Sequence, residues 1–154
     1  MKVKELMSTN IVCVKENATA EQIASHMRKN NVGSLPVCDD AGHVKGIVTD
    51  RDLVIRVLAK YSSAETPKDT NPASEITAAD IMTTEPVTVS PEHNIHDASI
   101  LFSAHKIRRL PVTEASRIVG MLSLGDVAVK PVYIDEAGDA LSSISLADGL
   151  QSQS

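Results

Sequence analysis

A chain of 154 residues with 42% hydrophobic and 23% charged residues is long enough for one globular domain or for two small repeats that share a core. A net charge of −5 and only two Tyr and one Phe argue against nucleic-acid binding, which needs a basic footprint and stacking side chains. No apolar run reaches membrane-spanning length, and no apolar signal region follows the first residues. We therefore expect a cytoplasmic protein that contacts neither nucleic acid nor membrane.

The first elements follow from local pattern. Residues 3–7 predict a short helical turn, and the β-branched run at residues 11–14 predicts a strand. Thr19 and Gln22 have the spacing of a capping box, which starts a helix that ends near residues 30–33. The apolar residues of this helix recur at the spacing of one buried face: Ala20, Ile23, Ala24 and Met27.

Leu35-Pro36-Val37 begins a predicted hairpin over residues 35–48, with a turn at residues 39–42. A helix from residue 50 to about residue 60 follows, and its expected buried face consists of Leu53, Val54, Val57 and Leu58. Residues 61–74 are polar and carry two prolines, which is typical of a linker.

The chain then repeats itself. Residues 79–84 resemble residues 4–9 at a spacing of 75, and Leu110-Pro111-Val112 repeats Leu35-Pro36-Val37 at the same spacing. Pro131 ends the last helix of the second copy, and a further helical segment places Ala137, Ala140, Leu141 and Ile144 on one face. We expect these divisions: repeat 1 at 1–60, linker at 61–76, repeat 2 at 77–131, a C-terminal helical segment at 132–146 and a flexible tail at 147–154.

One motif occurs in both copies, at the point where a strand ends and a helix begins: Gly46 to Asp52 and Gly120 to Asp126. A helix N-terminus attracts phosphate, so the Thr49 hydroxyl can donate to a phosphate or sugar oxygen. The Asp52 carboxylate, about one turn into the helix, can accept hydrogen bonds from both hydroxyls of a ribose. The same spacing also forms a helix-capping pair, and this alternative stays open for both copies.

The other chemistry-bearing residues favour structural roles. Cys13 and Cys38 lack CxxC spacing, so we expect buried, reduced thiols, with a disulfide as the alternative. His93 and His96 lie beside acidic residues and could help to hold a metal, but surface histidines fit the polar pattern better. No nucleophile elbow or phosphate-binding loop is present, so neither a catalytic residue nor a metal site is expected, and an enzyme has the least support.

Each copy reads β-α-β-β-α, carries Leu-Pro-Val before its hairpin turn, and ends in Gly-h-h-Thr/Ser-x-x-Asp, where h is hydrophobic. In these features residues 1–60 and 77–131 resemble a tandem pair of CBS domains, called a Bateman module, as found in stand-alone bacterial CBS-domain proteins. The resemblance implies an α/β (α+β) fold of two β-α-β-β-α repeats, packed sheet to sheet about a pseudo-twofold axis, with two clefts between them. It also implies a flat homodimer.

The resemblance further implies a regulatory, non-enzymatic module that binds an adenosine-containing ligand: AMP, ADP, ATP, S-adenosylmethionine or NAD. No cofactor is required, and the signal would pass to a separate effector protein of unknown identity. In one implied cleft, Ser123 and Asp126 face the first-strand edge Thr9, Asn10, Ile11 and Val12, plus Val32 to Ser34. In the other, Thr49 and Asp52 face Thr84, Glu85, Pro86 and Val87, plus Ile107, Arg108 and Arg109.

The two implied sites differ in charge. Arg108 and Arg109 precede the second Leu-Pro-Val, where repeat 1 has Gly33 and Ser34. In the motif itself, Arg51 of repeat 1 is matched by a glycine in repeat 2. We therefore expect unequal affinity. The competing hypothesis is a structural dimerisation module that has no physiological ligand.

Overall fold

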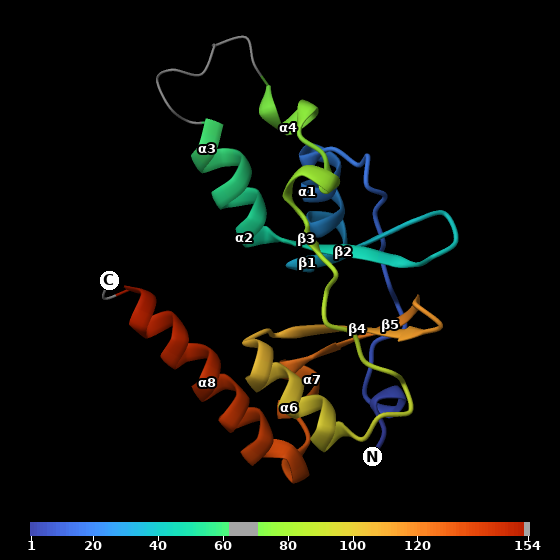
Figure 1. The fold of residues 1–154 in the computed structure, drawn as a ribbon, viewed down its shortest axis with the longest axis vertical. Coiled ribbons are helices and arrows are strands. Elements are labelled where there is room, and N and C mark those ends of the chain that lie inside the picture. The colour runs from blue at the N-terminus through green and yellow to red at the C-terminus, as the bar shows by residue number, and fades with distance from the viewer. Residues whose placement is uncertain (62–70, 153–154) are drawn as a thin grey trace. The chain divides into compact units, whose positions relative to one another are not determined.

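The computed structural model describes residues 1–61 and 71–152 of the chain. Its contacts divide the protein into two compact units. We call Met1–Ile11 together with Val87–Ser154 unit 1, and Val12–Pro86 unit 2. Both units mix helices with antiparallel strands, which confirms the predicted α/β class (Figure 1).

Unit 2 is built on a three-stranded antiparallel sheet of order β1-β2-β3. Its elements are α1 (Ala20–Asn30), β1 (Ser34–Cys38), β2 (Val44–Thr49), α2 (Asp50–Leu53), the π-helical η2 (Val54–Leu58), α3 (Ala59–Tyr61), α4 (Pro72–Glu75), α5 (Ala78–Ile81) and β3 (Thr83–Thr84). The predicted hairpin over residues 35–48 is thereby confirmed. The predicted linker at 61–76 contains α4, while residues 62–70 lie outside the described part.

The helix α1 begins as the capping box predicts. The Thr19 side chain accepts a hydrogen bond from the Gln22 backbone at 3.2 Å, and the Gln22 side chain accepts one from the Thr19 backbone at 3.0 Å. Asn31 ends the helix in the left-handed conformation. The helix buries Ala20, Ile23 and Met27 against the sheet residues Leu35, Val37 and Val48.

Unit 1 contains a two-stranded antiparallel hairpin covered by helices. Its elements are η1 (Val3–Glu5), α6 (Ile95–His105), β4 (Arg109–Glu114), β5 (Arg117–Ser123), α7 (Leu124–Ala128), η3 (Pro131–Tyr133) and α8 (Ile134–Ser152). The long helix α8 packs along α6 and α7 (Figure 1). Its buried residues Ala137, Ala140 and Ile144 join the core around Phe102, which confirms the predicted helical face except at Leu141, which is 46% exposed.

The units do not coincide with the sequence repeats, because the copies exchange their N-terminal segments. Ser8, from the start of the chain, exchanges backbone hydrogen bonds of 2.8 and 2.9 Å with Met121 in β5. In the same way, Thr83 and Thr84 pair with Ile47 and Gly46 of β2. Each motif is therefore accompanied by the segment that opens the other repeat.

Two lysines hold the exchanged N-terminal segment in unit 1. Lys2 and Lys4 both pair with the Glu92 carboxylate, Lys4 at 2.7 Å. Their hydrogen bonds, Lys2 first, lower the pKa of Glu92 to about 2. The segment is thus tied by ion pairs at residues 2–4 and by the backbone bridge at Ser8.

Three local predictions are wrong. Residues 11–14 form no strand; only Val14 makes a bridge, to Val37, because the chain turns at residues 16–17. In the helix after residue 50 only Val57 is buried, whereas Val54 and Leu58 are 52% and 59% exposed, since the π-helical segment shifts the register of the face. The expected tail from residue 147 is helical as far as Ser152, and residues 153–154 lie outside the description.

No helix among the described residues is both long enough and apolar enough to cross a membrane.

Candidate functional site

The first motif lies in unit 2, where β2 ends at Thr49 and α2 begins at Asp50. The Thr49 Oγ1 atom accepts a hydrogen bond from the Asp52 backbone N–H at 3.2 Å. The Asp52 Oδ2 atom accepts one from the Thr49 backbone N–H at 2.8 Å. The other carboxylate oxygen, Oδ1, lies 3.7 Å from Arg56 Nε, so this oxygen remains close to a cation on its own helix.

The second motif repeats this geometry in unit 1. Ser123 Oγ accepts from the Asp126 backbone N–H at 3.1 Å, and Asp126 Oδ2 accepts from the Ser123 backbone N–H at 2.8 Å. Both motifs are therefore capping boxes. Thr77 and Asp80 form another capping box at the start of α5, outside either motif, so this geometry alone indicates capping rather than a ligand site.

The hairpin register determines which residues flank each motif. Ser34 lies directly opposite Thr49, and the Gly33 carbonyl accepts a hydrogen bond from the Asp50 N–H at 2.9 Å. In unit 1, Arg109 lies opposite Ser123, and the Arg108 carbonyl accepts from the Leu124 N–H at 3.0 Å. Directly opposed residues of an antiparallel pair project to the same face, so Arg109 accompanies Ser123.

The resemblance assigned Val32 to Ser34 to the Ser123 site and Ile107 to Arg109 to the Thr49 site. Within each unit, the hairpin register sets the stretch before Leu-Pro-Val beside the motif of its own repeat. The physical reason is that the two strands of one hairpin bring the residues before Leu-Pro-Val against the residue that caps the following helix.

Each exchanged segment pairs with the strand that leads into a motif. In unit 2, Thr84 is opposite Gly46, and exposed Glu85 and half-buried Pro86 follow it. In unit 1, exposed Thr9 and Asn10 and half-buried Ile11 follow the Ser8 bridge to β5. Val12 belongs to unit 2, although it was expected beside the Ser123 motif of unit 1. Val87 belongs to unit 1, although it was expected beside the Thr49 motif of unit 2.

A glycine makes each close crossing possible. A Cβ atom added to Gly46 would lie 2.6 Å from the Met82 Sδ atom and 2.8 Å from the Thr83 carbonyl oxygen. One added to Gly120 would lie 2.5 Å from Met7 Sδ. Gly46 and Gly120 thus allow the exchanged segment to pack closely against the strand, and no ligand contact is needed to explain either glycine.

The charges around the two motifs differ more than the sequence motif suggested. In unit 2 the Asp50 carboxylate lies beside Gly33, since a Cβ on that glycine would be 3.0 Å from Asp50 Oδ2. In unit 1 the equivalent of Asp50 is Leu124, only 9% exposed, and the equivalents of Gly33 and Ser34 are exposed arginines. Asp50 was missed in the sequence, although alignment of the two motifs shows the difference.

The remaining candidates do not assemble into a site. His93 Nδ1 accepts a hydrogen bond from the Ser90 N–H at 3.3 Å, and His96 Nδ1 lies 3.5 Å from Glu136 Oε1 of α8. In residues 1–61 and 71–152, no group of three or more His, Cys, Asp or Glu side chains could hold a metal ion.

The profile of the CBS domain family matches two segments of this chain, residues 3–59 and residues 78–133. The chain belongs to the CBS domain family. The two matches are a tandem pair, and each contains one copy of the Thr/Ser–Asp motif. The resemblance seen in the sequence is thereby confirmed.

Proteins similar to this chain match it over most of its length. It is 38% identical to the CBS domain-containing protein YhcV of Bacillus subtilis, over 93% of this chain and 94% of the relative. It is 31% identical to hypoxic response protein 1 of Mycobacterium tuberculosis, with 81% of each chain covered. Its fold is similar to that of CBSX2 in complex with AMP, at a TM-score of 0.69, with 28% identity over 87% of this chain and 98% of the other.

Proposed function

We propose that this CBS pair is a non-enzymatic regulatory module that binds an adenine nucleotide, AMP in the first instance, and signals to a separate protein. The observation that carries this proposal is the setting of the Ser123 motif. In unit 1, one hairpin and the helix that follows it carry the Ser123 hydroxyl, two arginines and the Asp126 carboxylate, which can accept hydrogen bonds from ribose hydroxyls. The similarity to an AMP complex, that of CBSX2, supports the choice of nucleotide.

Each group has a defined role in the proposal. The Ser123 hydroxyl donates to a phosphate oxygen, and the arginines at 108 and 109 supply charge-assisted hydrogen bonds to the same phosphate. The Asp126 carboxylate accepts from the two ribose hydroxyls. The stretch from Thr9 to Ile11 offers backbone groups and an apolar side chain to the adenine.

The Thr49 motif is the weaker candidate site for an anionic ligand. Asp50 and Asp52 place two carboxylates close to the helix start, and Ser34 stands where unit 1 has an arginine. Exposed Arg51, next to both aspartates in the chain, is the cation that would offset their negative charge at this site. Like charges near a phosphate weaken its binding, so unequal affinity for AMP is expected.

Titration of the purified chain with AMP tests the proposal. AMP is expected to bind and to raise the melting temperature, because it binds the folded state alone. Asp126→Asn keeps an oxygen that can accept from the Ser123 N–H, but it cannot accept from both ribose hydroxyls. This variant is expected to weaken AMP binding by about 10- to 100-fold, and Asp52→Asn to have the smaller effect.

Asp80→Asn is the matched control, since the Asp80 carboxylate likewise accepts from the backbone N–H of its capping residue, Thr77, at 2.9 Å, but outside the motif. It is expected to leave AMP affinity unchanged while costing a similar small amount of stability. If AMP neither binds nor shifts the melting temperature, the proposed function is wrong. Equal losses of affinity in Asp126→Asn and Asp80→Asn would mean that capping, rather than ribose recognition, accounts for the effect.

Exposed apolar side chains favour a second function, dimerisation. Val54 and Ile55 on the helix after β2 are 52% and 51% exposed, and Val129 and Val132 after α7 are 76% and 79% exposed. Within each pair, exposed apolar side chains that lie close together in the chain are typical of an association surface. Light scattering is expected to give twice the chain mass of 16.4 kDa, and Ile55→Asp to give a smaller mass. A single-chain mass for the wild type would exclude this function.

A further inference from the structure

Two sulfur atoms of unit 2 lie in contact. Cys38 is the last residue of β1 and is 2% exposed, whereas Cys13 is exposed. The Cys38 thiol donates a hydrogen bond to Cys13 Sγ at 3.4 Å. The expectation of two buried thiols is therefore wrong for Cys13, because Val14 takes the inward position next to it and neighbouring extended residues face opposite ways.

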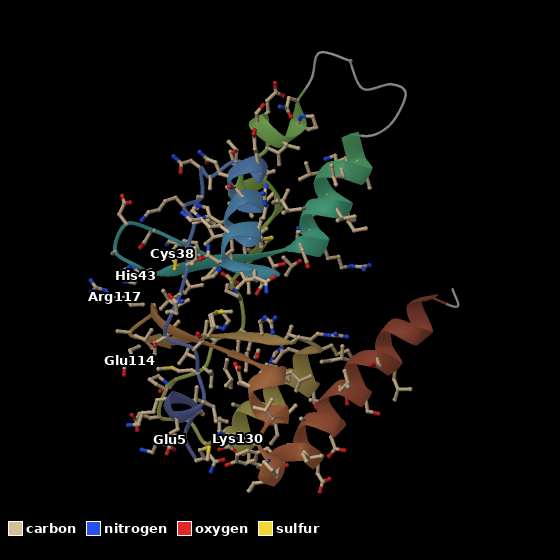
Figure 2. The ribbon with its side chains drawn as sticks, turned by 180° about the vertical axis from the view of Figure 1, so that it is seen from behind. Glu5, Cys38, His43, Glu114, Arg117 and Lys130 are labelled. Atoms are coloured by element: carbon tan, nitrogen blue, oxygen red, sulfur yellow. The ribbon has the colours of Figure 1, made fainter. Side chains whose placement is uncertain are left out.

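The backbone fixes this contact from both sides. The Val14 N–H donates to the Pro36 carbonyl at 3.0 Å, and the Cys38 N–H donates to the Val14 carbonyl at 2.9 Å. A cysteine side chain has only one rotatable bond before its sulfur. The main chain thus brings the two sulfurs together. Figure 2 shows Cys38 on the hairpin that also carries His43.

The surroundings give the two thiols different reactivity. The hydrogen bond from Cys38 lowers the pKa of Cys13, and the Lys15 ammonium lowers it further, against the opposing effect of burial. The same hydrogen bond and burial raise the pKa of Cys38. Because the thiolate is the reactive form, Cys13 is the attacking sulfur and Cys38 keeps its proton.

Lys15 is held at this position by the turn of the hairpin. Its Nζ atom donates to the Asp39 carbonyl at 3.0 Å and lies 3.0 Å from Asp40 Oδ1. Lys45, on the next strand, approaches the same turn only within 3.9 Å of Asp39 Oδ2. Lys15 is therefore the lysine whose charge acts on the two thiols, and Lys45 offers a comparison at the same turn.

We propose that Cys13 and Cys38 form a thiol–disulfide pair in which a hydroperoxide oxidises exposed Cys13 and buried Cys38 closes the disulfide. The Cys13 thiolate attacks a peroxide oxygen, the O–O bond breaks, and Cys13 becomes a sulfenic acid as hydroxide leaves. The Cys38 sulfur then attacks the Cys13 sulfur, the S–O bond breaks, and water leaves with the Cys38 proton. With hydrogen peroxide, two thiols are oxidised and the peroxide is reduced to two waters.

The disulfide would close a chain loop that contains the whole of α1. It would also fix the segment after Ile11, where the chain passes from unit 1 to unit 2. Because a cross-link over such a loop restricts the unfolded chain, the oxidised protein is expected to melt several degrees higher than the reduced protein. This proposal does not depend on AMP binding.

Intact-mass measurement on the full chain tests it. The reduced protein, freed of reductant, is treated with one equivalent of hydrogen peroxide at pH 7. The expected product has lost about 2 Da and both reactive thiols, contains a peptide that links Cys13 to Cys38, and reverts with dithiothreitol. A chain that keeps both thiols, gains only oxygen on Cys13, or links to a second chain would overturn the proposal.

Three variants separate the roles of the groups. Cys38→Ala is expected to stop at the sulfenic acid of Cys13, which dimedone traps, and to slow alkylation of Cys13 by iodoacetamide. Lys15→Gln is expected to slow alkylation several-fold at pH 7 and less at pH 10, since the charge acts through the thiolate fraction. Lys45→Gln, the control, is expected to react as the wild type does. Equal rates in Lys15→Gln and Lys45→Gln would refute the role of Lys15.

Discussion

Replacing Phe102 with alanine is expected to lower the free energy of unfolding by about 3–5 kcal/mol. Phe102 is the one phenylalanine of the chain and is fully buried on α6, in the core that α6 shares with β4, β5 and α8. Its loss removes apolar contacts and leaves a cavity among side chains that come from four elements. Urea denaturation followed by circular dichroism measures the change.

Ile100→Ala on the same helix is the matched control, because Ile100 is 53% exposed. Its loss is expected to cost less than about 1 kcal/mol. Because the total stability of a domain is about 5–15 kcal/mol, Phe102→Ala takes a large share of it. A loss below about 1 kcal/mol for Phe102→Ala would mean that the core of unit 1 is not packed around this ring.

Replacing Gly46 with valine is expected to cost about 1–3 kcal/mol, because the new side chain has no space. Its Cβ would lie 2.8 Å from the Thr83 carbonyl oxygen, a backbone atom that cannot rotate away. The strand β3 would have to move off β2, and Thr84 to Pro86 with it. Thermal denaturation measures the loss of stability, and AMP titration shows whether the exchanged segment matters to binding.

Gly125→Ala provides the comparison at a glycine with space. An added Cβ there would meet only the Ser123 Oγ atom, at an ordinary 3.6 Å. Since alanine is the better helix former, this change in α7 is expected to be neutral or to stabilise by about 0.5–1 kcal/mol. If both glycines tolerated substitution equally, the close approach of β3 to β2 would not be a constraint.

The capping boxes formed by Thr or Ser with Asp show how one local arrangement can serve two purposes. At Thr77 it only starts a helix, since nothing else of the motif surrounds it. At Ser123 the same hydrogen bonds leave the Asp126 carboxylate at the edge of a hairpin that also carries Arg109. The setting, and not the box, is what supports a nucleotide site there.

Local pattern was sufficient for what depends on neighbours three or four residues apart. The Thr19 capping box, the buried face of α1, the β1–β2 hairpin and the end of α7 before Pro131 all follow from such short-range interactions. The two motif copies were equally visible, because strand end, cap and helix start are adjacent in the chain. Repetition at a fixed spacing then identified the tandem CBS pair.

The sequence by itself therefore determined the repeat, the family and the residue types of the candidate sites. Only the tertiary structure decided that Arg109 stands opposite Ser123 and that the sulfurs of Cys13 and Cys38 meet. These features join residues far apart in the chain, and their register depends on how whole strands pack. No pattern of neighbouring residues encodes that choice, which is made by the burial of the core and the pairing of backbone hydrogen bonds.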